Sequence, residues 1–287
     1  MTGLVPLLDT HQHLVYPERQ AYAWMEAAPA LQGRAFTLGD YHGLVAGGGV
    51  AGTIFMEVDA ADYRAESRMI ARLAADPASG ILGQIASCRP EADEGFEAWL
   101  DEGPSLGVVG YRRILHETAD DVSGSGTFRA NVRRIGARGL PFDMCFLARQ
   151  LPIALDLARA CPDARLVLDH CGVPDIAGGA WDGWRQGVRA LAGEPNVVAK
   201  LSGVFAYVAP GEARLATVAP WVEEVIAAFG PGRCLWGSDW PVCTVKGGTL
   251  PDWIAAFRAI LAGCSEAEQR AMAHGTAEAV YGVRLAA

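Results

Sequence analysis

The chain has 287 residues, 51% of them hydrophobic, and a formal net charge of −9 at pH 7. The length suits one large domain, and the acidic balance argues against nucleic acid or an anionic membrane as the main partner, because both require a basic surface. An anionic small substrate is not excluded, because its binding depends on nearby arginines and not on the net charge. No apolar run approaches the ~18 residues of a spanning helix, and the start lacks the basic segment of a signal peptide. The seven cysteines are scattered and read as reduced, so we expect a cytoplasmic protein.

Short apolar runs alternate with amphipathic segments along the chain. The predicted strands are, in order, Leu4–Asp9, Gly52–Val58, Ile81–Ser87, Val108–Leu115, Leu140–Phe146, Arg165–His170, Asn196–Leu201 and Arg233–Gly237. The predicted helices between them include Tyr63–Ala75, Gly126–Ala137, Leu151–Ala160, Trp184–Ala192 and Val218–Phe229. Such alternation is typical of βαβ units with a parallel sheet. Eight units, without a glycine-rich phosphate turn after the first strand, predict an α/β fold of the (β/α)8 TIM-barrel type, as a single domain over residues 1–287.

The segment Asp9-Thr10-His11-Gln12-His13 is the most informative part of the sequence. Side chains alternate across a strand, so His11 and His13 point the same way. Two neutral imidazoles directed into one cavity can bind a divalent metal or donate hydrogen bonds to a carbonyl oxygen. This pair of histidines is weak evidence for a functional site on its own. The polar segments after the other predicted strands strengthen it.

Five polar segments follow predicted strands one, four, six, seven and eight. They are Asp9–His13, Gly110–Arg113, Asp169–Pro174, Lys200–Gly203 and Gly237–Val242. In barrel enzymes the active site is built at the carboxyl ends of the strands. We therefore expect residues that are distant in sequence to meet around one barrel mouth.

Asp239 is the strongest single candidate, because a carboxylate after the last strand would share this mouth with the histidines and could take a proton from water. The alternative is an Asx-type turn residue ahead of Pro241. His170 could instead be a buried histidine that bonds a backbone carbonyl, and Asp169 beside it is expected to face the other way.

Substrate contacts are predicted at several strand ends. Alternation sends at most one of Arg112 and Arg113 into the mouth, where an arginine suits a carboxylate or a hydroxyl-rich ligand; the alternative is two salt-bridged barrel residues. Lys200 and Glu57 could reach the cavity or be structural. Trp24 could form a pocket wall or pack in the core. The remaining histidines have no motif around them and stay unassigned.

The chain resembles the amidohydrolase superfamily, and within it the TIM-barrel branch that contains sugar-acid lactonases. The matching segments are Asp9–His13, Ala23-Trp24, Gly110–Arg113, Arg149–Pro152, Leu168–Pro174, Lys200–Gly203, Phe229–Pro231, Gly237–Val242 and Gly275–Ala277. They extend over nearly the whole chain. The branch includes lactonases for L-fuconate-type and L-rhamnonate-type lactones and for pyrone dicarboxylate.

The resemblance implies an active site of His11, His13, His170 and Asp239, with Arg112 at a substrate-contact position. Aspartate activates water, and the histidines polarise the lactone carbonyl, directly or through a metal. The resemblance implies either no metal or one zinc ion. The ligands of a bound zinc ion would be His11, His13 and Asp239. A second metal is disfavoured because strand five carries no histidine.

The predicted function is hydrolysis of an aldono- or aldaro-lactone to the free acid. Arg113 and Glu57 depart from the residues common among relatives. The lactone specificity of a particular relative therefore cannot be assigned to this chain. Three alternatives remain: hydrolysis of a dicarboxylate lactone of the pyrone type, hydrolysis of an amide, or a non-catalytic barrel that binds a sugar acid. The sequence does not decide whether copies associate into a homo-oligomer.

Overall fold

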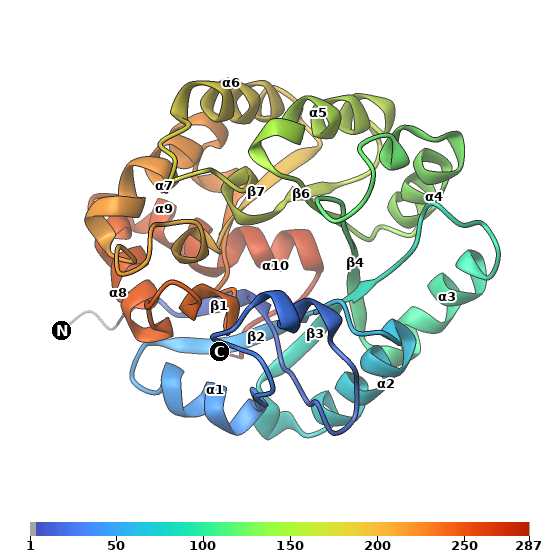
Figure 1. Cartoon of the computed structure of the whole chain (residues 1–287), viewed down its shortest axis with the longest axis horizontal. Helices are drawn as coiled ribbons and strands as arrows, with labels where there is room; N and C mark the ends of the chain where they lie inside the picture. Colours follow the sequence, from blue (N-terminus) through green and yellow to red (C-terminus); the bar gives the residue numbers. More distant parts are fainter. Residues whose placement is uncertain (1–3, 287) are drawn as a thin grey trace.

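The computed structural model describes residues 4–286, and its strands form one eight-stranded parallel sheet in the order β1 to β8. The strands are β1 (Leu7–Gln12), β2 (Val50–Met56), β3 (Ile81–Ser87), β4 (Val108–Ile114), β5 (Phe142–Cys145), β6 (Leu166–Leu168), β7 (Val197–Leu201) and β8 (Cys234–Trp236). A parallel bridge joins Gln12 of β1 to Trp240, in the segment that follows β8. The sheet therefore closes into the predicted TIM barrel (Figure 1).

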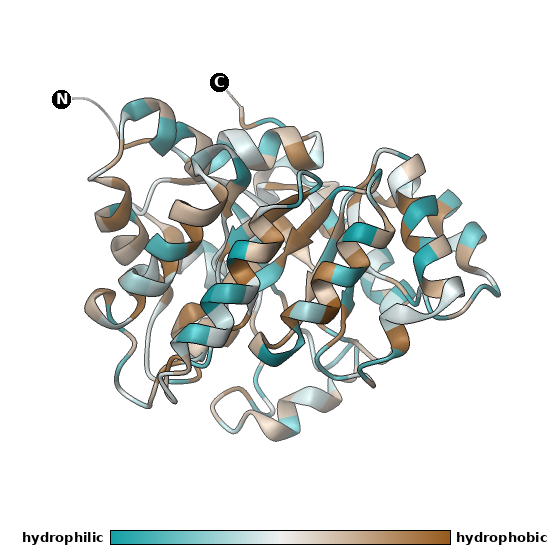
Figure 2. Ribbon diagram, turned by 90° about the horizontal axis from the view of Figure 1, so that it is seen from above, coloured by the Kyte–Doolittle hydropathy of each residue, from teal (hydrophilic) through white to brown (hydrophobic). Residues whose placement is uncertain are grey.

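Most of the helices surround the barrel on its outer side (Figure 1). The helices are α1 (Leu38–Val45), α2 (Tyr63–Ala74), α3 (Phe96–Glu102), α4 (Gly126–Ala137), α5 (Leu151–Ala160), α6 (Trp181–Ala192), α7 (Leu215–Phe229), α8 (Leu250–Leu261), α9 (Glu266–Arg270) and α10 (Thr276–Tyr281). In α5 the buried positions are Leu151, Ala154, Leu157 and Ala158, the spacing that places apolar residues on one helix face. Figure 2 shows that other helices also carry hydrophilic stripes, and that the strands inside the barrel are largely hydrophobic. None of the helices among residues 4–286 has both the length and the apolar character needed to span a bilayer.

The observed elements match the predicted ones closely, except at two strand ends that carry polar residues. The bounds of α4 and α5 coincide with the prediction. β1 runs three residues further than predicted and thus includes His11. β6 ends at Leu168, so His170 does not lie in a strand as expected. The reason is that the backbone of His170 and Cys171 turns into the left-handed region, with φ of 54° and 55°.

A small apolar cluster fills the barrel interior beneath the polar strand ends. Its members from the strands are Leu8, Ile54, Met56, Ile85, Val167, Val198 and Leu235, and those from the C-terminal segment are Ala277, Tyr281 and Val283. α10 thus packs against the inward side chains, and it crosses the centre of the barrel in Figure 1. This packing leaves the opposite end of the barrel to the polar residues.

Candidate active site

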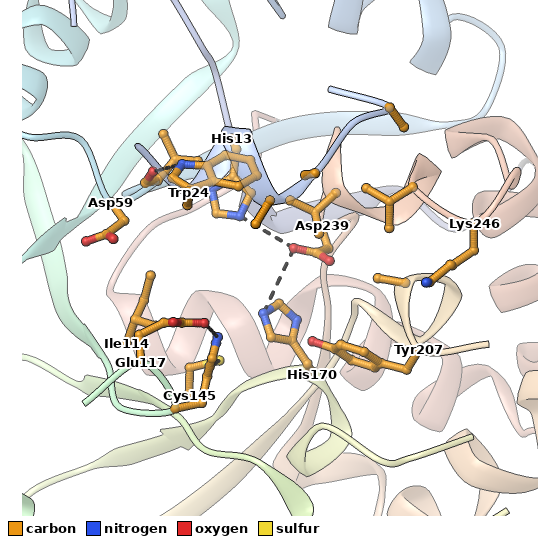
Figure 3. A pocket seen from close by; sticks show the side chains of 18 of the residues that line it. His13, Trp24, Asp59, Ile114, Glu117, Cys145, His170, Tyr207, Asp239 and Lys246 are labelled. Atoms are coloured by element: carbon orange, nitrogen blue, oxygen red, sulfur yellow. Dashed lines mark hydrogen bonds and ion pairs between the residues drawn. The ribbon is translucent and has the colours of Figure 1, made fainter. Parts of the chain in front are cut away.

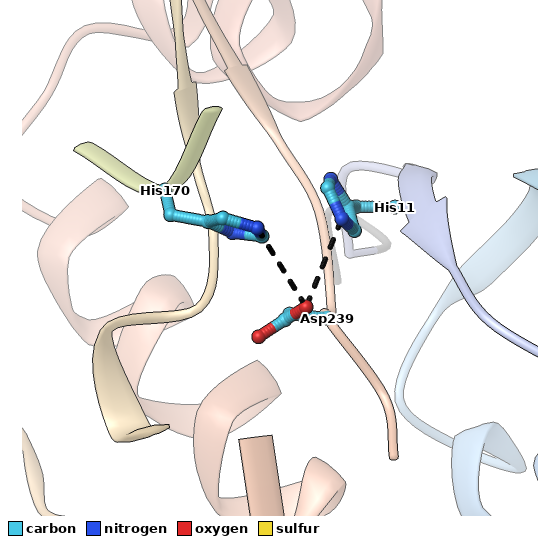
Figure 4. A group of neighbouring side chains, drawn as sticks. All are labelled: His11, His170 and Asp239. Atoms are coloured by element: carbon cyan, nitrogen blue, oxygen red, sulfur yellow. Dashed lines mark ion pairs between the residues drawn. The ribbon is translucent and has the colours of Figure 1, made fainter. Parts of the chain in front are cut away.

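Three histidine rings converge on one oxygen of Asp239. The Nε2 atoms of His11, His13 and His170 lie 3.7, 3.4 and 3.9 Å from Asp239 Oδ1. These four side chains are at most 5% exposed. Three of the five segments predicted to meet at the barrel mouth therefore do so (Figure 3, and Figure 4 for His11, His170 and Asp239).

The local backbone aims these side chains in ways that strand alternation does not provide. His170 and Asp239 both have positive φ, which few non-glycine residues adopt. The Asp239 turn is fixed by a hydrogen bond from its N–H to the carbonyl of His11 at 2.8 Å. Gly203 makes room for the second turn: a Cβ at Gly203 would stand 2.5 Å from His170 Nδ1. Unusual φ values at several residues of one cluster are characteristic of functional sites.

Hydrogen bonds determine which ring nitrogens carry protons. His13 Nδ1 lies 2.9 Å from the carbonyl oxygen of Met56, which can only accept, so Nδ1 of His13 is the donor. A guanidinium can only donate, and Arg112 Nη1 lies 3.2 Å from His11 Nε2, so this nitrogen is the acceptor. In their neutral forms, both rings thus have an unprotonated Nε2 beside Asp239. Neither could polarise a carbonyl by direct donation from that atom.

Burial keeps the His11 and His170 rings neutral. Desolvation, followed by the nearby His170, holds the pKa of His11 well below its usual range. Desolvation also lowers the pKa of His170 to about 4, against the opposing effect of Asp239. Two neutral imidazoles therefore stand beside the Asp239 carboxylate.

The donor set fits a divalent metal ion. Among residues 4–286, the groups whose ligand atoms all lie within 4.8 Å of one another are His11–His170–Asp239 and Cys145–Asp169–His170. Two ligand atoms at ~2.1 Å from a tetrahedral zinc ion are roughly 3.4 Å apart, a few tenths of an ångström less than the distances from His11 and His170 to Asp239. The trio expected from the sequence, with His13 in place of His170, does not form such a group, although His13 is adjacent.

Arg112 lines the cavity but is only 3% exposed. Its Nε donates to Glu57 Oε1 and its Nη2 to the Glu57 backbone oxygen, both at 2.6 Å. Burial alone would raise the pKa of Glu57, but Arg112 outweighs this effect and lowers it. Glu57 is thus the buried partner of Arg112, and the side chain does not line the cavity as a substrate contact would.

Lys200 lies below the cavity in a buried ion network. Its Nζ is 2.5 Å from Asp143 Oδ2 and 3.3 Å from Asp169 Oδ1, and all three side chains are fully buried. Asp169 also approaches His11 Nδ1 at 3.6 Å, so the expectation that it faces away is wrong. The left-handed turn after β6 directs both Asp169 and His170 inward. Lys200 likewise does not line the cavity among the described residues.

The cavity above the histidines has a volume of about 670 Å³. Trp24 lines it, as predicted for a wall residue, with its indole N–H bonded to the Val58 carbonyl at 2.7 Å. Arg113 lies outside it, because alternation turns the side chain toward Glu91, with an ion pair at 2.7 Å. Figure 3 shows Trp24 beside His13.

Four further wall residues carry chemistry that the sequence analysis missed: His116, Cys145, Tyr207 and Lys246. His116 and Lys246 stand in loops without a motif, so local sequence contained no signal for them. Tyr207 lies in the segment between β7 and α7.

Comparison with known proteins agrees with this geometry. The family model described as amidohydrolase matches residues 8–283. An L-fucono-1,5-lactonase from Burkholderia ambifaria is 31% identical over 254 residues, 86% of this chain and 85% of the relative. An L-fucono-1,5-lactonase from Burkholderia multivorans is 30% identical, covering 96% of this chain and 95% of the relative.

A solved structure shares the fold over nearly the full length. It is an amidohydrolase from Burkholderia multivorans with bound zinc, with a TM-score of 0.88 and 27% sequence identity. The match covers 97% of this chain and 100% of that one.

Proposed function

The chain belongs to the amidohydrolase family, and on this premise we propose that it hydrolyses a sugar-acid lactone to the open-chain acid. The observation that carries the proposal is the convergence of three histidine Nε2 atoms on Asp239 at the base of a cavity large enough for a small ring. The two relatives named as lactonases support the choice of substrate class.

In the proposed reaction, Asp239 is the general base. Its Oδ2 accepts no hydrogen bond, so the carboxylate has the capacity to take a proton from water. The water oxygen then bonds to the lactone carbonyl carbon, and the ring C–O bond breaks. Asp239 returns its proton to the departing ring oxygen, which gives the free hydroxyl and the acid. Because a lactone is an activated ester, this needs no nucleophilic serine or cysteine.

The developing negative charge on the carbonyl oxygen requires a partner. Arg112 Nη1 is the guanidinium nitrogen not bonded to Glu57, and it faces the site beside His11. We assign it the role of an oxyanion donor. His11, His170 and Asp239, with His13 adjacent, would hold a zinc ion, which supplies Lewis acidity and a lowered pKa for water at the site.

The charges of the cavity favour a neutral lactone over a dicarboxylate one. Asp59 and Glu117 line it as carboxylates in addition to Asp239. Arg112 is neutralised by Glu57, and Asp59 is paired with Arg89 at 3.6 Å. This leaves Glu117 and Asp239 against Lys246, a lining cation without an ion pair among the described residues. A dianionic substrate would meet more negative than positive charge, whereas a polyhydroxylated ring can bond these carboxylates.

The same proposal includes a reducing compartment, since none of the seven cysteines forms a disulfide and six of them are buried. We therefore keep the expectation of a cytoplasmic enzyme as part of the proposal.

The test is a pH-indicator hydrolysis assay with aldono- and aldaro-lactones, in chelator and with added zinc. We expect turnover of at least one sugar lactone, loss of activity after chelation, and recovery with zinc. Asp239→Asn should lower kcat by at least ~10²-fold, the range for loss of a general base. If Asp239→Asn keeps full turnover, or if the wild type only binds the lactones, the proposed mechanism is wrong and a sugar-acid-binding barrel becomes the better interpretation.

A further inference from the structure

We propose that Asp169 is a positioning residue that holds the proton of His11 on Nδ1 and thereby keeps His11 Nε2 unprotonated for a metal ion. The inference deepens the proposed function and rests on it, because it concerns the same site. It assigns a role to a carboxylate that the hydrolysis scheme does not use.

Asp169 lies among buried donors, of which His11 Nδ1 has no other hydrogen-bond partner. Its Oδ1 lies 3.6 Å from His11 Nδ1, and its Oδ2 lies 3.7 Å from Arg112 Nη1. Both carboxylate oxygens and His11 Nδ1 are buried and lack a hydrogen bond within the usual distance. Unsatisfied buried polar groups cost free energy, so shortening the contact between His11 and Asp169 would satisfy both partners. Hydrogen bonds of this kind are often long in unliganded sites and shorten in the working complex.

The two sides of the His11 ring agree on one tautomer. Arg112 can only donate, so His11 Nε2 must accept. An ionised carboxylate can only accept, so His11 Nδ1 must donate to Asp169. A metal-binding histidine is commonly held this way, with one nitrogen on a carboxylate and the other on the metal. The geometry thus prepares His11 for metal binding.

Lys200 explains how a carboxylate can stay ionised at this depth. Its Nζ is 3.3 Å from Asp169, and burial would otherwise disfavour the charge. The same ammonium is 2.5 Å from Asp143, which Tyr281 also contacts at 2.8 Å. Asp143 and Asp169 are therefore both fully buried and share Lys200, but Asp143 makes no contact with His11 among the interactions of the described residues. Asp143 provides the matched control.

The first experiment needs no variant. Long-range ¹H–¹⁵N spectra of histidine-labelled, zinc-free protein report the tautomer of each ring, and a His11→Asn sample assigns the His11 signals. We expect the proton of His11 on Nδ1. A proton on Nε2 in the wild type would overturn the proposal even if every substituted protein failed to fold.

The second experiment compares Asp169→Asn with Asp143→Asn. Zinc affinity is measured by competition with a chromophoric chelator, and circular dichroism checks the fold. We expect Asp169→Asn to weaken zinc binding 10- to 100-fold and to alter the His11 tautomer. Asp143→Asn should keep both at wild-type values, whatever it does to stability.

Three outcomes would overturn the inference: wild-type zinc affinity in Asp169→Asn, an equal loss in Asp143→Asn, or a second zinc equivalent that Asp169→Asn abolishes, which would make Asp169 a ligand. Because neither measurement uses a lactone, a failure of the proposed hydrolysis would be seen separately in the activity assay.

Discussion

Replacing Gly203 by alanine tests how closely the turns that carry His170 and Asp239 pack against Gly203. The added Cβ would stand 2.5 Å from His170 Nδ1 and 3.1 Å from Asp239 Oδ2. Ordinary contact begins near 3.4 Å, so the His170 ring has to move by about 1 Å. A displacement of this size at a catalytic group costs on the order of 10²-fold in rate. The positive φ of Gly203 adds roughly 1–2 kcal/mol of strain for alanine.

Gly139→Ala is the matched control, because Gly139 has φ of 72° and an added Cβ there would have no neighbouring atom within 4 Å. Gly139→Ala should lose only the free energy of unfolding due to its positive φ, and Gly203→Ala at least as much, measured by urea denaturation. Only Gly203→Ala should lose about 10²-fold in kcat on a lactone substrate. Equal kcat values for Gly203→Ala and wild type would refute the argument that this close approach fixes His170.

Two other substitutions test buried groups. Arg112→Lys keeps the charge, but one ammonium group cannot donate to Glu57 and to the reacting oxygen together. We therefore expect kcat to fall about 10²–10³-fold. An unchanged kcat would contradict the donor role. Burial, followed by the charge of Glu57, raises the pKa of Glu66 well above its usual range. The folded state therefore holds this proton more tightly than the unfolded chain, and stability falls as pH rises above the ordinary glutamate pKa. Glu66→Gln should raise Tm relative to wild type at pH 8 and not at pH 4, by scanning calorimetry; a difference independent of pH would contradict this sign.

The sequence alone was sufficient for the architecture and for the location of the site. Alternating apolar runs and amphipathic segments predict a parallel barrel, and the carboxyl ends of parallel strands lie at one edge of a sheet. His11, His13, His170 and Asp239 could therefore be brought together without coordinates. Alternation along β4 also predicted that one arginine faces inward, and Arg112 does so.

The tertiary structure decided what each polar residue touches. Asp169 and His170 both turn inward because the chain leaves β6 in a left-handed turn, which strand periodicity does not encode. The sequence predicted that Lys200 and Glu57 could reach the cavity. In the structure both form buried ion pairs instead, with Asp143 and Arg112, which are more than 50 residues away along the chain. Such pairings depend on which strands are neighbours and on how deeply each side chain is buried. Both are properties of the closed barrel, so the contacts of His11 and the His11–His170–Asp239 group became visible only there.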